Sequence, residues 1–182
     1  MIKVFFILIS FCFSQWYSLN HEGVVRSFYV SYPDINQNEN IESVPLIINM
    51  HGFGSNAQEQ QLYSQMDLYA HADNIAVVYP EGLNNSWNVY TYWDSNVYDD
   101  VGFISLMIDD IAQNFDINLD RVYACGMSNG GYMSYRLACD LSNKIAAFGS
   151  VTGNFMINNE SNDCLDQERE IPIIQIFSSS LS

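Results

Sequence analysis

Positively charged residues are scarce in this chain of 182 residues. Only six residues are Lys or Arg, against 21 Asp and Glu, which gives a formal net charge of −15. A surface of this charge repels a phosphate backbone, so we expect no nucleic-acid partner. Charged residues make up only 15% of the chain and hydrophobic residues 48%, which argues against intrinsic disorder and fits one domain with a buried core.

A hydrophobic run long enough to span a bilayer is also missing. The N-terminal run Val4–Phe13 has about half the residues that such a helix needs. Lys3 precedes it, and Cys12 and Ser14 are small residues at positions −3 and −1 of a cut after Ser14, as is typical of a secretory signal. We predict a signal peptide over residues 1–14 and a secreted domain, extracellular or periplasmic, over residues 15–182 that needs no membrane after cleavage. A buried N-terminal strand or helix is the alternative.

Cysteines are few, and their spacing is not that of a zinc site. Residues 15–182 contain Cys125, Cys139 and Cys164, without a CxxC or Cys/His pattern, so we expect no metal. An oxidising compartment permits one disulfide and leaves one thiol. Cys125 lies in an apolar, strand-like run and is expected to be a buried thiol. Cys139 and Cys164 flank a predicted strand and a polar loop, and we expect them to be the pair.

Strand and helix patterns alternate along the chain from Pro45 onward. Period-two and short apolar runs predict strands over residues 24–32, 45–50, 75–79, 121–127, 146–152 and 171–177. Apolar residues at spacings of three and four predict helices over residues 58–73, 101–115 and 129–141. This order indicates an α/β protein with a mostly parallel sheet and helices on both faces. Active groups then gather beyond the carboxyl ends of the strands.

The strongest chemical signal is Gly126-Met127-Ser128-Asn129-Gly130, a G-x-S-x-G sequence between a predicted strand and a predicted helix. A sharp strand-to-helix turn needs small residues two before and two after the serine, so that the strand and the helix can approach closely. The serine oxygen is then exposed at the helix N-terminus, where N–H groups favour an oxyanion. We predict that Ser128 is a nucleophile and that Gly126 and Gly130 form its elbow. An ordinary glycine-rich turn with an incidental serine is the alternative.

A second turn, His51-Gly52-Phe53-Gly54, directly follows the strand predicted over residues 45–50. It sets a backbone N–H opposite the one after Ser128. The N–H groups of Phe53 and Asn129 would together make a two-donor oxyanion hole. His51 is interpreted as a structural residue of this turn rather than as the catalytic base. An ordinary glycine turn is the alternative here as well.

These motifs resemble those of the secreted α/β-hydrolases grouped as polyhydroxybutyrate depolymerases and feruloyl or acetylxylan esterases. The resemblance runs from about residue 20 to residue 176. It rests on VVRSFYVSYP, PLIINMHGFGSN, VVYPEG, DDVGFISLMIDDIA, RVYACGMSNGGYMSYRLAC and IAAFGSVTG. It implies the α/β-hydrolase fold, acyl transfer through an acyl-serine intermediate, and no cofactor. The implied partners are ester substrates on polysaccharide (feruloyl or acetyl esters) or polyester chains.

The same resemblance implies roles for particular residues. Ser128 would be the nucleophile, with Phe53 and Asn129 as the oxyanion donors. Cys139 and Cys164 would match a disulfide of the relatives. The run Asp100-Val101-Gly102-Phe103 would open a helix packed beneath the elbow.

A histidine after Ser128 is missing from this sequence. The triad order in this fold is Ser, then Asp or Glu, then His, whereas the three histidines here, His21, His51 and His71, all precede Ser128. Relatives follow the strand matching IPIIQI with a turn that carries the triad acid, where this chain reads FSSSLS. Without a base the serine stays protonated, which costs many orders of magnitude in rate.

We therefore expect a C-terminally truncated esterase that lacks the last strand and the histidine loop and is itself inactive. Its apolar strand over residues 171–177 would then be an exposed edge and an aggregation site. His21 or His71 as a substitute base, and Asp163 or Asp166 as a substitute acid, remain alternatives.

Three functions remain open from the sequence. The first is an extracellular serine esterase, in which aromatic residues of the loop over residues 82–100 either stack on a sugar or phenolic ring or pack the loop down. The second is a non-catalytic fragment or glycan-binding relic, which the absent base favours. The third is a peptidase of the same fold, which no residue of the sequence specifically indicates.

Overall fold

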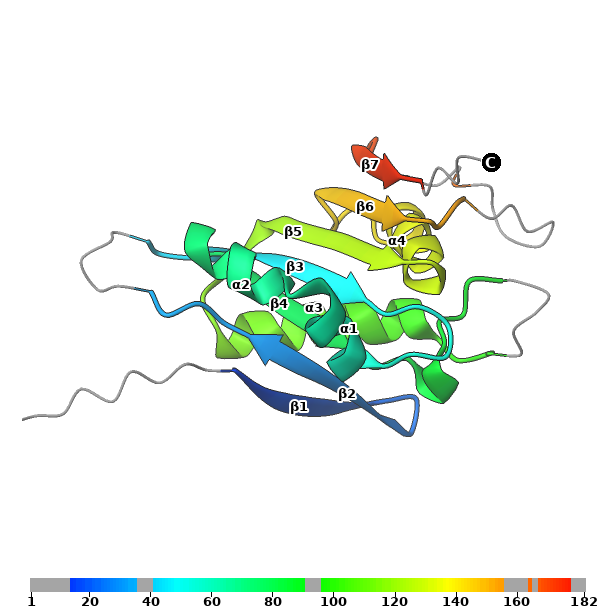
Figure 1. Ribbon diagram of the computed structural model, residues 1–182, viewed down its shortest axis with the longest axis horizontal. Coiled ribbons are helices and arrows are strands. Elements are labelled where there is room, and N and C mark those ends of the chain that lie inside the picture. Colours follow the sequence, from blue (N-terminus) through cyan, green and yellow to red (C-terminus); the bar gives the residue numbers. More distant parts are fainter. Residues whose placement is uncertain (1–13, 36–40, 91–95, 156–163, 165–166, 178–182) are drawn as a thin grey trace, which may run out of the picture.

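A seven-stranded sheet with helices packed on it forms the body of the computed structural model (Figure 1), which describes residues 14–35, 41–90, 96–155, 164 and 167–177. The strands are β1 (Ser14–His21), β2 (Val24–Ser31), β3 (Val44–Met50), β4 (Ala76–Pro80), β5 (Ile117–Met127), β6 (Ala147–Val151) and β7 (Ile173–Ile176). The helices are α1 (Ala57–Ser64), α2 (Met66–Ala70), α3 (Asp100–Asn114) and α4 (Asn129–Asp140), with 3-10 turns at His71–Asp73 and Leu83–Asn85.

The strand order is β1-β2-β4-β3-β5-β6-β7. Strands β3 to β7 pair in parallel, whereas β2 pairs antiparallel with both β1 and β4. Strand β3 lies in the middle, and six of its seven residues are buried because it is covered on both faces. Its carboxyl end at Met50 pairs with Gly126 of β5, so the turns that follow these two strands lie side by side.

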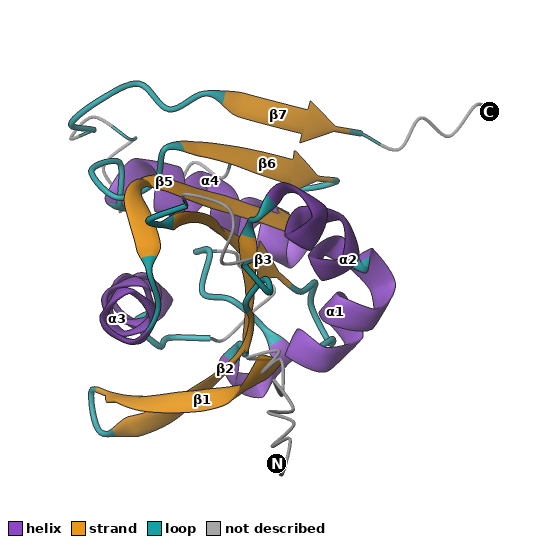
Figure 2. Ribbon diagram, turned by 90° about the vertical axis from the view of Figure 1, so that its left-hand side faces the viewer, coloured by secondary structure: helices purple, strands orange, loops and turns teal. Residues whose placement is uncertain are grey.

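Helices cover both faces of the sheet, as Figure 2 shows: α3 and α4 lie on one face and α1 and α2 on the other. The main core lies under α3 and α4, where Phe103, Ile104, Met107 and Leu137 are buried against β3 and β5 residues such as Ile48 and Val122. The parallel sheet and the two helical layers confirm the predicted α/β-hydrolase fold class. Within the described residues, none of the helices is long and apolar enough to cross a membrane.

The helix predicted over residues 58–73 is wrong in its continuity and in its buried face. Gln65 has a left-handed backbone (φ 47°) that ends α1 and starts α2 in a new direction. Spacings counted across this break therefore do not define one face, and Leu62 and Tyr69 of the predicted face are 68% and 73% exposed. The buried residues of the two helices are instead Ala57, Gln60 and Ala70.

Strand β1 is an element that the sequence did not predict. It begins at Ser14 and pairs along its whole length with β2. The two strands form a hairpin that is closed by the two-residue turn Glu22-Gly23. The rest of the predicted signal peptide, residues 1–13, lies outside the described residues, so the structure does not test that prediction.

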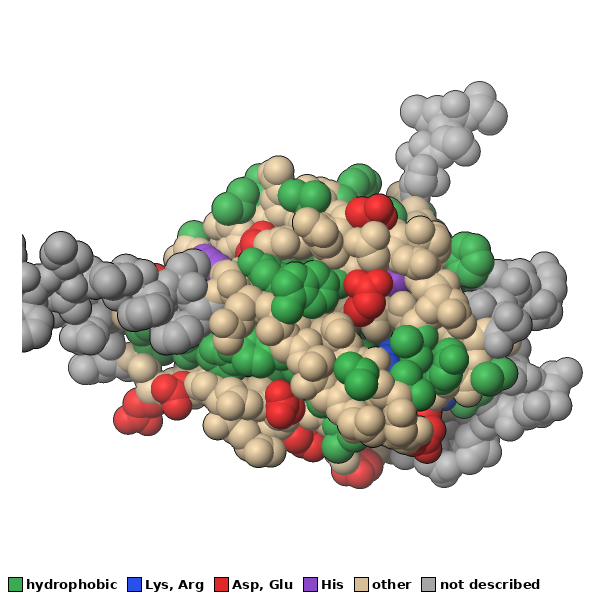
Figure 3. Space-filling view, turned by 90° about the horizontal axis from the view of Figure 1, so that it is seen from below, with side chains coloured by type: hydrophobic (Ala, Val, Ile, Leu, Met, Phe, Trp, Pro, Cys, Tyr) green, Lys and Arg blue, Asp and Glu red, His purple; other side chains and the backbone are tan. Residues whose placement is uncertain are grey.

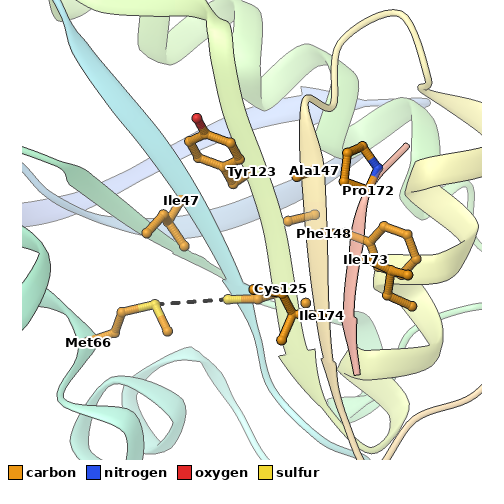
Figure 4. Close-up of a pocket in the computed structure, with 11 residues that line it drawn as sticks. Ile47, Met66, Tyr123, Cys125, Ala147, Phe148, Pro172, Ile173 and Ile174 are labelled. Carbon is orange, nitrogen blue, oxygen red and sulfur yellow. Dashed lines mark hydrogen bonds between the residues drawn. The ribbon is translucent and has the colours of Figure 1, made fainter. Parts of the chain in front are cut away.

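The exposed apolar edge predicted over residues 171–177 is present. β7 is the last strand of the sheet, and Ile174 and Phe177 are 70% and 69% exposed. Next to it, no described helix covers the β6-β7 part of the face that α1 and α2 occupy (Figure 2). An apolar groove of about 390 Å³ lies there (Figure 4), lined by Met66, Cys125, Phe148, Pro172, Ile173 and Ile174, among others.

Candidate active site

Ser128 occupies the turn between β5 and α4, at the carboxyl end of the sheet. Its backbone angles are φ 52° and ψ −116°, a strained conformation that residues other than glycine rarely adopt. The Ser128 N–H donates to the carbonyl of Val151 on β6 at 2.8 Å, and the Ser128 carbonyl accepts from Tyr132 at 2.9 Å. These two bonds fix the turn from both sides. Ser128 itself is half-buried, so its side chain is not sealed in the core.

The two glycines of the motif are required by close packing. A Cβ on Gly126 would lie 2.7 Å from the Met50 carbonyl oxygen and 2.5 Å from the Gly130 carbonyl carbon. A Cβ on Gly130 would overlap the Met50 carbonyl oxygen and lie 2.7 Å from the carbonyl oxygen of His51. Strand β5, helix α4 and the end of β3 therefore meet without room for a side chain, which is the arrangement predicted for the elbow.

The His51–Gly54 turn lies directly against Ser128. A Cβ on Gly52 would be 3.7 Å from the Cβ of Ser128. Phe53, the next residue, is 58% exposed. Asn129 is the first residue of α4, and its N–H, like those of any first helical turn, has no partner within the helix. The two predicted oxyanion donors thus stand on adjacent turns beside the serine, and their role stays a prediction.

His51 is held in one tautomer by the backbone. Its Nδ1–H donates to the Gly52 carbonyl at 2.8 Å, and its Nε2 accepts the Gly82 N–H at 3.0 Å. The ring is fully buried and packs against Trp87 with 5.0 Å between ring centroids. Burial lowers the pKa of His51 below 6.5, and the Gly52 hydrogen bond raises it by less. Both ring nitrogens are occupied, so His51 serves the turn and not Ser128.

The other two histidines are engaged away from the elbow. His21, at the end of β1, has its Nε2 3.0 Å from Asp99 Oδ2. The His71 ring contacts Ser31 of β2 at 3.2 Å. These hydrogen bonds join each histidine to groups other than Ser128. Asp163 and Asp166, the substitute acids considered above, lie outside the described residues.

Asn129 and Trp87 tie the long loop to the elbow. The Trp87 N–H donates to Asn129 Oδ1 at 2.6 Å, and Asn129 Nδ2 donates to the Trp87 carbonyl at 3.2 Å. The indole N–H of Trp87 donates to the His51 carbonyl at 2.9 Å, and its ring is fully buried. Trp87 therefore packs the loop down, which decides between the two interpretations of this residue. Tyr92 and Trp93 lie outside the described residues.

A buried ion pair that the sequence did not reveal anchors the same loop. Arg26 Nη2 on β2 is 2.6 Å from Asp100 Oδ1 at the start of α3, and both side chains are almost fully buried. Asp100 Oδ2 accepts the Asn88 N–H at 2.7 Å and the Asn96 side-chain amide at 3.3 Å. The guanidinium also lies over the ring of Phe103, 3.9 Å from its centroid. Arg26 and Asp100 are 74 residues apart in sequence, so no local pattern indicated that they would pair.

Tyr90 leaves one aromatic ring of the loop at the surface. It is 46% exposed and lies under the guanidinium of Arg136, whose carbon is 4.0 Å from the ring centroid. Arg136 Nη2 also donates to the Tyr90 hydroxyl at 2.6 Å. Arg136 is about two helical turns after Ser128 on α4, so the Tyr90 ring lies against α4 at that distance from the elbow.

Cys139 and Cys164 form a disulfide that ties α4 to the segment before β7. The remaining cysteine among the described residues, Cys125, is a free thiol on β5, whose pKa burial raises to about 12. A thiol with such a pKa stays protonated at neutral pH and is a poor nucleophile.

Several known proteins are similar to this chain in sequence. A sequence profile described as esterase PHB depolymerase matches residues 29–167, which is most of the chain. Curated relatives include a bifunctional acetylxylan esterase/xylanase of Neocallimastix patriciarum, 27% identical over 136 residues, covering 75% of this chain and 19% of its own length. Feruloyl esterase D of Neurospora crassa is 29% identical over 151 residues, covering 76% of this chain and 49% of its own length.

Solved structures show the same fold. An S-formylglutathione hydrolase from Staphylococcus aureus superposes with a TM-score of 0.64 at 19% identity, covering 78% of this chain and 57% of that one. An acetyl xylan esterase from Aspergillus awamori superposes with a TM-score of 0.62 at 15% identity, covering 76% and 52%. The chain thus spans at most about half the length of these two curated relatives.

Proposed function

Because the chain belongs to the esterase PHB depolymerase family, we propose that it carries the nucleophile and the oxyanion hole of a serine esterase acting on carboxylic esters. The observation that carries this proposal is the strained φ of 52° at Ser128, held between β5 and the N-terminus of α4 by two glycines. Strain of this kind persists only where the surrounding structure enforces it. We infer that it serves to present the serine oxygen to the N–H groups of the helix N-terminus.

The proposed reaction is acyl transfer through Ser128. Ser128 Oγ attacks the ester carbonyl, the carbonyl oxygen becomes an oxyanion beside the N–H groups of Phe53 and Asn129, and the alcohol leaves. Water then hydrolyses the acyl-serine. Both steps need a base that takes the proton from the attacking oxygen, and His51 is occupied by Gly52 and Gly82. We therefore propose that the 182 residues alone turn over esters only slowly.

For the substrate, we propose feruloyl or acetyl esters on polysaccharide, with polyester chains as the wider class. The exposed Phe53 ring supports an aromatic acyl group, because it stands on the turn that adjoins Ser128. Relatives described as feruloyl and acetylxylan esterases support it as well. We also propose that residues 1–14 direct secretion, since a disulfide between Cys139 and Cys164 fits an oxidising compartment. N-terminal sequencing of the exported protein checks this cleavage.

Binding of an arylboronic acid tests the half-site, that is, the nucleophile Ser128 with the oxyanion donors Phe53 and Asn129. This binding needs no turnover and therefore no base for turnover. Boron adds to a positioned serine oxygen as a tetrahedral anion that resembles the acyl-transfer transition state. Boron-11 NMR of the chain with phenylboronic acid should show a tetrahedral signal that Ser128→Ala abolishes. Ser55→Ala is the matched control, because Ser55 is a nearby serine whose hydroxyl donates to Glu59. An unchanged signal in Ser128→Ala would refute the proposal.

The second candidate is a glycan-binding protein without catalysis, which the occupied histidines favour. Sedimentation with insoluble xylan distinguishes it. Binding of the native chain and of Ser128→Ala to the same extent, with no boronate adduct in either, would support this candidate over the esterase half-site.

A further inference from the structure

Three side chains of metal-binding type meet at the tip of the β1-β2 hairpin. His21 and Glu22 come from the hairpin, and Asp99 comes from the end of the long loop that precedes α3. One ligand atom from each lies within 4.8 Å of the other two, and His21 Nε2 is 3.0 Å from Asp99 Oδ2. We propose that this cluster binds a divalent transition-metal ion, with Zn²⁺ the best match to its donors.

The donor set decides the class of ion. One imidazole nitrogen and two carboxylate oxygens suit Zn²⁺, which accepts nitrogen and oxygen ligands in a four-coordinate site. Ca²⁺ and Mg²⁺ prefer oxygen alone and more ligands. Three protein ligands leave the fourth position to water. Two carboxylates also balance the charge of the ion, in a chain whose formal net charge is −15.

The backbone places the three ligands near one another. Glu22 and Gly23 have φ values of 50° and 80°, so the hairpin closes in two residues, and the exposed Glu22 stands in this turn beside His21. Asp99 Oδ1 accepts the Gly102 N–H at 2.9 Å, which caps α3 and leaves Oδ2 toward His21. The His21 side chain is only 13% exposed, whereas that of Asp99 is 42% exposed, so the cluster opens to solvent on one side.

Gly102 provides the room that the cluster needs. A Cβ at Gly102 would lie 2.8 Å from the His21 ring and would overlap Asp99 Oδ2. The imidazole therefore packs directly on the first turn of α3. This contact explains a glycine at the third position of a helix, where glycine is otherwise unfavourable.

A metal here would have a structural role. It would join the hairpin to the end of the loop whose other contacts run through Asp100 to Asn88 and through Trp87 to Asn129. His21 and Asp99 are 78 residues apart along the chain, which is why no spacing in the sequence indicated a metal site. The face that carries β1 shows scattered acidic side chains and little basic surface, so it does not repel a cation (Figure 3).

Calorimetry of the full 182-residue chain, freed of metal with a chelator and titrated with zinc chloride, tests the proposal. We expect one ion per chain with micromolar affinity and a rise in melting temperature with zinc concentration. Cobalt(II) as a probe should give the visible absorption of a four-coordinate site. The absence of saturable binding would overturn the proposal, and the His21–Asp99 contact would then be a hydrogen bond only.

Conservative variants assign the ligands. His21→Gln, Glu22→Gln and Asp99→Asn should each weaken zinc binding at least about tenfold, and Asn at position 99 keeps the helix cap. His71→Gln is the matched control, because His71 contacts Ser31 and takes no part in the cluster. If His71→Gln weakens binding as much as His21→Gln, or if His21→Gln leaves it unchanged, the site is refuted. Melting curves of the metal-free variants show that each one folds.

Discussion

Gly130 is the residue whose size matters most to the elbow. An alanine there would drive its Cβ into the carbonyl groups of Met50 and His51, which are backbone atoms and cannot turn aside. We expect Gly130→Ala to lower the free energy of unfolding by about 3 kcal/mol, as forced overpacking does. Gly149→Ala on β6 is the control, because its Cβ would lie 3.5 Å from its nearest neighbour, an ordinary contact. Urea unfolding of both variants measures the difference, and equal losses would contradict the close packing.

The buried imidazole of His51 makes stability depend on pH. Because burial lowers its pKa below 6.5, the unfolded chain takes up a proton on His51 before the folded chain does. This residue therefore stabilises the fold fully above about pH 6.5, and the contribution is lost as the pH falls through the lowered pKa. NMR titration of the ring should give a value below 6.5. A His51 resonance that titrates at or above 6.5 would show that the ring is not buried.

Some residues of the site could be predicted from the sequence and others could not. Ser128, Gly126 and Gly130 stand in a motif whose spacing is dictated by the turn, so their positions could be predicted. Trp87 could not be assigned between packing and stacking, because a tryptophan in a polar loop fits both. Its burial under the elbow follows from hydrogen bonds to His51 and Asn129.

At the scale of elements, the Arg26–Asp100 pair joins β2 to the start of α3. Removing one partner leaves a buried charge uncompensated, so we expect Asp100→Ala to cost about 3–5 kcal/mol of unfolding free energy. Asp109→Ala is the control on the same helix, because the Asp109–Lys144 pair is exposed and we expect its loss to cost about 1 kcal/mol or less. Thermal unfolding of the two variants compares them. Similar melting temperatures would contradict a buried pair that stabilises the fold.

The elements themselves were largely predictable from β2 onward. Short buried runs gave β3 and β4, and the apolar face of Ile104, Met107, Ile108 and Ile111 gave α3, because local periodicity reflects burial on one face. Strand β1 was missed because it is an edge strand that pairs with β2 alone and has no buried residue that would form an apolar pattern. The break at Gln65 was missed because a left-handed residue other than glycine leaves no clear signal. The ion pair was missed because its partners are 74 residues apart.

For the whole molecule, the uncovered apolar face beside β7 is the surface most prone to self-association. An apolar edge strand with free N–H and C=O groups invites pairing with another chain. We expect the native chain to self-associate at micromolar concentrations and Ile174→Lys to shift it toward the monomer. Leu62→Lys on α1 is the control, since Leu62 is 68% exposed but lies on a different element. Sedimentation velocity decides: a native chain that stays monomeric, or equal effects of both variants, would contradict the prediction.

Ser128 stands in a formed elbow, and each of the three histidines of the described residues is engaged away from it. The most direct test is the hydrolysis of p-nitrophenyl acetate with increasing imidazole, which offers a small base to an open site. We expect an imidazole-dependent rate for the native chain that exceeds that of Ser128→Ala by about tenfold or more. The same imidazole dependence in both proteins would contradict it, because the serine would then take no part in the reaction.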